Sequence, residues 1–101
     1  MSRLALPNRR PCERVRLEHD GQRYYATFSE AGGQVAEVFL QGGKSGTAIE
    51  AIARDSGVAV SLAFQHGASL QELQKSMTRD DAASAAGPML AALDKIAKVL
   101  E

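Results

Sequence analysis

The chain has 101 residues, 45% of them apolar, and its 12 lysines and arginines balance 12 aspartates and glutamates. This length predicts one domain with one core, and the balanced charge argues against a dedicated nucleic-acid binder, which uses excess Lys and Arg to displace counterions from phosphates. Because Cys12 is the single cysteine, an intramolecular disulfide is excluded, and no stretch approaches the roughly 20 apolar residues that span a bilayer, so we expect a soluble protein of the reducing cytoplasm without a membrane partner.

Residues 1–12 are predicted to form an extended basic arm ahead of a single domain at 13–101. Pro7 and Pro11 fix their own backbone and push the preceding residue away from helical conformation. The arm and the first two strands are rich in arginine, which predicts either a solvated surface or a patch for a phosphate-bearing ligand or an acidic partner. These arginines are Arg3, Arg9, Arg10, Arg14, Arg16 and Arg23.

Alternating apolar and polar side chains predict three β-strands, over residues 13–19, 23–28 and 35–41. The Asp-Gly pair at 20–21 is a signal for a tight hairpin, and a second glycine turn follows the second strand. These short connections predict an antiparallel sheet. Its third strand is apolar at Phe39 on one side and at Leu40 on the other, so the alternation does not decide which of them faces away from the core.

A helix is predicted to begin at Ser45 or Thr47, either of which can cap it, and to end at His66. Apolar residues recur along it at helical spacing, and residues 58–64 are apolar nearly all round the helix. This pattern predicts the most buried helix of the domain. Gly57 costs a helix interior about 1 kcal/mol relative to alanine, so its presence indicates that a neighbouring element approaches the helix backbone closely.

Two further helices are predicted in the last third of the chain. Ser69 and Glu72 form a capping box that opens a short helix, and Pro88 stands where the first turn of the last helix tolerates proline. The order predicts an α+β fold, in which a three-stranded antiparallel sheet is followed by three helices packed on one face. The other face is either solvated or covered by a second protomer, which predicts a homodimer or larger homo-oligomer.

The glycine loop Gly42-Gly-Lys-Ser-Gly-Thr47 links the third strand to the first helix. Glycine N–H groups, a lysine, two hydroxyls and the positive end of a helix converge there, which suits a phosphate or carboxylate. A P-loop would need glycine at position 38, which is Val38, so nucleotide hydrolysis is not predicted. A helix N-terminus alone stabilises an anion by about 0.3–1 kcal/mol, so a ligand needs further groups. The candidate ligand-binding residues are Lys44, Ser45, Gly46, Thr47, Arg9 and Arg10. The alternative is a plain strand-to-helix turn.

No catalytic or metal-binding constellation is predicted. His19 and His66 are the only histidines in the sequence and are expected to be structural. No Cys/His pair has the spacing of a metal site, and no serine has the context of a nucleophile elbow. The acidic pair at 80–81 is typical of a solvated loop. We therefore expect no catalytic residue, no metal and no cofactor.

Eight short segments carry a family resemblance. They are Leu6-Pro-Asn-Arg-Arg10, Tyr24-Tyr-Ala-Thr27, Ala36-Glu-Val-Phe-Leu40, Gly43-Lys-Ser-Gly46, Ala53-Arg-Asp55, Ser61-Leu-Ala-Phe-Gln-His-Gly67, Gly87-Pro-Met-Leu90 and Leu93-Asp94. Through them the chain resembles the TSCPD domain family over almost its whole length. That family is found near the C-terminus of cobalamin-dependent ribonucleotide reductases and also as short stand-alone proteins.

The Thr-Ser-Cys-Pro-Asp signature that names the family would fall at residues 85–89, where this chain has Ala85-Ala-Gly-Pro-Met89. Only Pro88 matches, so a thiol or metal role attached to the signature cysteine does not transfer. A chain of this length also has no room for the reductase barrel, its radical cysteines or its cobalamin site. Alone, it is not expected to reduce ribonucleotides.

The leading hypothesis is a stand-alone accessory or binding module related to ribonucleotide reductase. It would be non-catalytic alone and would hold a nucleotide-like or phosphate ligand as an oligomer. One alternative is a detached subunit of a cobalamin-dependent ribonucleoside-diphosphate reductase that works with a separate catalytic chain. Another is a pure protein-interaction domain that docks through its arginine arm and open sheet face.

Overall fold

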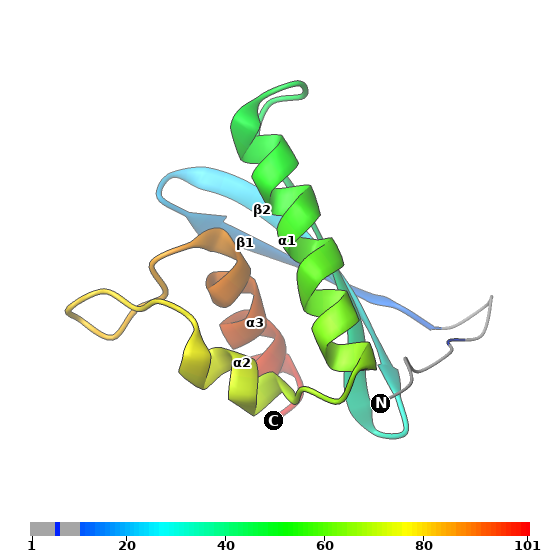
Figure 1. Cartoon of the computed structure of the whole chain (residues 1–101). Coiled ribbons are helices and arrows are strands. Elements are labelled where there is room, and N and C mark those ends of the chain that lie inside the picture. Colours follow the sequence, from blue (N-terminus) through cyan, green and yellow to red (C-terminus); the bar gives the residue numbers. More distant parts are fainter. Residues whose placement is uncertain (1–5, 7–10) are drawn as a thin grey trace.

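The computed structural model describes residue 6 and residues 11–101, and within them three strands precede three helices (Figure 1). The elements are β1 Glu13–His19, β2 Gln22–Ala31, β3 Gln34–Gly42, α1 Ala48–Gln65, α2 Leu70–Ser76 and α3 Pro88–Val99. The predicted α+β class and element order are confirmed. Most of the predicted arm, including Arg9 and Arg10, lies outside the described residues, so the division at residue 12 stays a prediction.

The sheet is antiparallel throughout, in the order β1-β2-β3. The hairpin between β1 and β2 turns at Asp20 and Gly21, whose φ angles of 50° and 76° match the left-handed conformation that an Asp-Gly turn adopts. A β-bulge shifts the register of β2 against β3 between Ser29 and Glu30. The predicted strand periodicity is confirmed, and β2 extends beyond the predicted range at both ends.

The core lies between the sheet and the helices, which stand on the same side of it (Figure 1). The largest fully buried side chains are Leu40, Leu90, Leu93, Ile96 and Val38. Three of these five belong to α3, so α3 is the best-buried helix, and the prediction that α1 would be is wrong. Leu40 points into the core, which leaves Phe39, 46% exposed, on the open face of the sheet.

Helix α1 lies along the outer edge of β3. The Ser61 hydroxyl accepts a hydrogen bond from the Val38 N–H and donates one to the Val38 carbonyl, both at 2.9 Å. The Gln65 side-chain amide donates to the Ala36 carbonyl at 3.2 Å. An unpaired strand edge exposes such groups and invites pairing with other chains. Here two polar side chains of α1 bond to part of that edge.

At Gly57, helix α1 packs tightly against the main chain of β3. A Cβ atom at this position would be 3.1 Å from the Val38 carbonyl oxygen and 3.3 Å from the Leu40 nitrogen. The predicted close approach to Gly57 is therefore confirmed, and the neighbour is the main chain of β3. The predicted capping box at Ser69 and Glu72 is also present at the start of α2. No helix among the described residues is long and apolar enough to cross a membrane.

Candidate functional site

The six residues of the glycine loop, 42–47, connect the end of β3 to the start of α1. Gly43 and Gly46 have φ angles of 79° and 81°, a region that side chains disfavour, so both positions require glycine. Thr47 caps the helix, as predicted: its Oγ1 accepts from the Glu50 N–H at 3.2 Å and donates to the Lys44 carbonyl at 2.6 Å. The local sequence thus folds as a well-capped helix start.

A carboxylate of the protein already lies at this helix start. Glu50 Oε1 accepts a hydrogen bond from the Gly46 N–H at 3.3 Å and one from Arg54 at 3.2 Å. Lys44 and Ser45 are exposed on the loop. An anion that used the Gly46 N–H would have to displace Glu50, whose charge also complements the helix dipole. The predicted ligand site at Lys44, Ser45, Gly46 and Thr47 therefore stays a prediction.

The open face of the sheet gathers cationic and aromatic side chains. The Arg14 guanidinium lies 4.1 Å from the centre of the Tyr25 ring, a cation–π contact. Arg16 pairs with Tyr25 across β1 and β2, and Phe39 pairs with Thr27 across β2 and β3. Arg23, Arg16 and Arg14 are all exposed. Strand alternation puts Arg14, Arg16, Arg23 and Tyr25 on this face, and the structure adds Phe39 to it.

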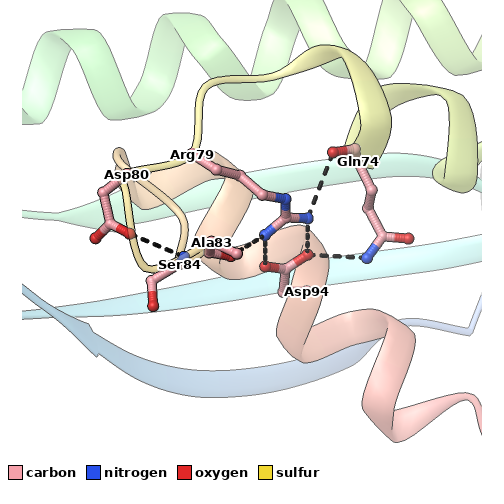
Figure 2. A network of polar contacts seen from close by, with 6 residues as sticks. All are labelled: Gln74, Arg79, Asp80, Ala83, Ser84 and Asp94. Atoms are coloured by element: carbon pink, nitrogen blue, oxygen red, sulfur yellow. Dashed lines mark hydrogen bonds and ion pairs between the residues drawn. The ribbon is translucent and has the colours of Figure 1, made fainter.

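A polar network links the loop before α3 to Asp94 on α3 (Figure 2). No local pattern in the sequence indicates it. Arg79 makes two bonds to the Asp94 carboxylate, at 2.8 and 3.0 Å, and Gln74 donates to the same carboxylate at 2.9 Å. Asp80 accepts from the N–H groups of Ala82 and Ser84. The predicted loop is thus a folded turn held by ion pairing, and Asp80 is structural.

The Arg79–Asp94 pair makes stability depend on pH. The hydrogen bond from Arg79 is the main cause that lowers the pKa of Asp94, and burial opposes it. Because this pKa is lower in the folded than in the unfolded chain, the pair stabilises the fold above the unfolded pKa, and the contribution is lost as pH falls through the folded pKa. In thermal melts from pH 7 to pH 3, the advantage of the wild type over Asp94→Asn should shrink once the pH falls below the unfolded pKa of an aspartate.

The control for this series is Asp81→Asn, which removes an exposed carboxylate from the same turn. Its melting temperature should follow the wild type at every pH. Because both partners of the pair are about one-third exposed, at 32% and 30%, water screens the interaction and the effect on melting should be modest. An Asp94→Asn difference that stays constant down to pH 3 would contradict the assignment.

A groove of about 680 Å³ lies beside this network, between β1, the turn at 83–85 and α3. Its walls include Leu17, Ala85, Asp94 and Lys98. His19 on its border lies 3.2 Å from the Ala86 carbonyl and 3.4 Å from the Asp20 carboxylate, consistent with the structural role expected of it. Among residues 11–101, no group of three or more His, Cys, Asp and Glu side chains is placed to hold a metal ion.

Comparisons with known proteins place this chain in a family. The sequence profile of the TSCPD domain matches residues 3–101. A vitamin B12-dependent ribonucleotide reductase of Agrobacterium fabrum (strain C58 / ATCC 33970) is 32% identical over 77 residues, which are 75% of this chain and 6% of the reductase. The chain therefore spans a small fraction of that relative, and no solved structure matches it. The resemblance stated from the sequence is confirmed: this chain belongs to the TSCPD domain family.

Proposed function

We propose that this protein is an accessory module related to ribonucleotide reductase that acts by binding and is non-catalytic alone. The match to a segment amounting to 6% of a B12-dependent ribonucleotide reductase supports a role as one part of a larger system. The observation that carries the proposal is the open sheet face, where Arg14, Arg16, Arg23, Tyr25 and Phe39 lie together and no helix among residues 11–101 covers them.

This face has the composition of a binding surface. Tyrosine and arginine dominate the energetics of protein interfaces because they combine a large contact area with polar or charged groups. Phe39 on β3 is 46% exposed. A bound partner would remove this apolar surface from water, which is favourable. Three arginines against Glu18 and the buried Glu37 leave the face with a net positive charge, so the fitting partner presents acidic side chains.

The proposed partner is the catalytic chain of a cobalamin-dependent ribonucleotide reductase. Two versions of this proposal differ in what binding achieves. As a detached subunit, the module would be required for the reductase reaction; as a docking domain, it would bind without changing the rate. An assay of the purified catalytic chain with and without this protein separates the two versions, because only a subunit raises ribonucleotide reduction.

Substitutions on the open face are expected to weaken this association by about tenfold or more, because they remove an aromatic anchor or reverse a steering charge. The variants are Phe39→Ala and Arg16→Glu, and Lys75→Glu on α2 is the control, since Lys75 is exposed on the helical side. Isothermal titration calorimetry against the purified catalytic chain measures each dissociation constant. No binding by the wild type, or an equal loss in Lys75→Glu, would refute the open face as the docking site.

A second candidate function is binding of a nucleotide-like anion at the glycine loop. It is favoured by the exposed Lys44 and Ser45 beside a capped helix N-terminus. Even millimolar affinity requires about 4 kcal/mol, so such a ligand would need Arg9 and Arg10 as well as the loop. The same calorimeter tests it with ATP and inorganic phosphate, on the wild type and on Lys44→Ala; unchanged heats in the two proteins would count against it.

A further inference from the structure

The two edges of the sheet differ. Helix α1 bonds to the outer edge of β3, whereas β1 forms the opposite edge (Figure 1). Among residues 11–101, the main-chain hydrogen bonds of β1 go to β2 and to no other segment. β1 contains no proline, and its register against β2 is unbroken from Glu13 to His19. Such an edge presents main-chain groups that can pair with a further strand.

The bonding pattern of the sheet decides which residues of β1 point outward. The Val38 N–H and carbonyl leave β3 towards Ser61 of α1. These groups alternate in direction along a strand, so Phe28, which lies opposite Val38, turns its own towards β1. The same alternation in β1 directs its odd-numbered residues to β2. The outward main-chain groups are therefore those of Arg14, Arg16 and Glu18.

The fold leaves room beside this edge. The groove of about 680 Å³ lies between β1, the turn at 83–85 and α3, and Leu17, Glu18 and His19 form its β1 side. A paired strand lies about 4.8 Å from its neighbour. A strand added to β1 would therefore run along the mouth of the groove, on the side away from β2.

The charges of β1 select the strand that can pair with it. Charged side chains keep most strands away from a free edge. Here the outward residues are basic at Arg14 and Arg16 and acidic at Glu18, and Asp20 follows in the turn. An acidic strand would be repelled at one end and a basic strand at the other. A strand with the same order of charges, running in the opposite direction, matches both ends.

We propose that β1 is a self-association edge, on which the β1 strands of two copies pair antiparallel about a two-fold axis at Leu17. With Leu17 opposite its own copy, Arg16 of each copy lies opposite Glu18 of the other. Both residues have outward main-chain groups, so they exchange N–H and carbonyl bonds, and their side chains meet on the open face. The two sheets become one, with all the helices on the same side.

Charge also favours this register over its neighbours. The two nearest registers with the same main-chain pattern place Arg16 opposite Arg16, or Glu18 opposite Glu18. Like charges directly opposite each other destabilise an antiparallel pair. The register centred on Leu17 instead forms the Arg16–Glu18 pair twice. Because the contact is confined to one short strand, it is smaller than a standard interface, and a dissociation constant in the micromolar range is expected.

Sedimentation equilibrium of the full chain alone tests the proposal. The wild type should reach twice its 10.8 kDa mass at about 100 μM. Arg16→Glu sets carboxylates opposite each other, and Glu18→Arg does the same with guanidinium groups. Each variant should raise the dissociation constant by at least about tenfold. Both side chains are exposed, so the circular dichroism spectrum should stay that of the wild type.

An equimolar mixture of Arg16→Glu and Glu18→Arg tests the register. In the mixed pair every carboxylate again lies opposite an arginine, so a heterodimer should form about as tightly as the wild-type dimer, and native mass spectrometry identifies its composition. The control pair is Lys75→Glu and Asp81→Arg, which make the same changes in net charge at exposed positions away from β1. These two proteins should dimerise like the wild type, alone and mixed.

A monomeric wild type would overturn the proposal and leave the edge to a strand of another protein. Single variants at 16 and 18 that dimerise like the wild type, or a control pair that does not, would also overturn it. A mixture that stays monomeric would overturn the register centred on Leu17. Phe39→Ala separates this proposal from the reductase partner, because it should weaken that association and leave the dimer intact.

Discussion

Replacing Gly57 with leucine is expected to lower the free energy of unfolding by more than about 3 kcal/mol. The added Cβ alone would lie 3.1 Å from the Val38 carbonyl oxygen, 3.3 Å from the Leu40 nitrogen and 3.4 Å from the Phe39 Cα atom. These are main-chain atoms of β3, which cannot turn aside as a side chain can. The rest of a leucine side chain would drive α1 off the strand and break the bonds that Ser61 and Gln65 make to it.

Chemical denaturation of a size series checks this expectation. Gly57→Ala combines a gain of about 1 kcal/mol in helix propensity with a contact that is a few tenths of an ångström too short, so it should change stability much less than leucine does. Arg54→Leu is the control for adding leucine to α1, because Arg54 is exposed and loses a surface pair worth about 0.3–0.5 kcal/mol. A Gly57→Leu protein as stable as this control would show that α1 does not rest on β3.

The three strands could be predicted from sequence because alternation and glycine turns are local signals. The contact of α1 with the outer edge of β3 could not be predicted in this way. Helical periodicity identifies an apolar side of a helix but not the element that it meets. Ser61 interrupts the apolar run at 58–64 and Gln65 follows it, and neither position indicates a bond to a strand. For the same reason, apolar residues on the outer side of α1, such as Val58 and Leu62, were expected to be buried, but they are exposed in the structure.

In the candidate site, too, some features could be predicted from sequence and others could not. The Thr47 cap could be predicted, since capping is a relation between residues three apart. Thr47 and Glu50 also have the capping-box spacing, which predicts that the Glu50 side chain reaches back to the helix start. That it accepts from the Gly46 N–H depends on the conformation of the loop, which the spacing does not give. Arg79 and Asp94 are 15 residues apart and meet through the packing of α3, so their pairing also lay beyond a reading of local pattern.

Ser61→Ala is expected to destabilise the protein by about 2–4 kcal/mol, because it removes the one hydroxyl that bonds to two buried main-chain groups of Val38. Ser61 is 7% exposed and Val38 is fully buried. In the wild type one hydroxyl serves the Val38 N–H and carbonyl together. Alanine would leave both groups without a hydrogen bond on the unpaired side of β3, in a space where the helix excludes water.

Ser56→Ala on the same helix is the matched control. Its hydroxyl donates to the Ala53 carbonyl within α1 at 2.8 Å and reaches no strand, so alanine there should be neutral or slightly stabilising. Hydrogen exchange localises the effect: in Ser61→Ala the protection of the Val38 amide should fall before that of the β1–β2 pairs, because the edge opens first. Equal stability of the two serine variants would mean that water or a shifted helix serves Val38, and that packing around Gly57 alone holds α1 in place.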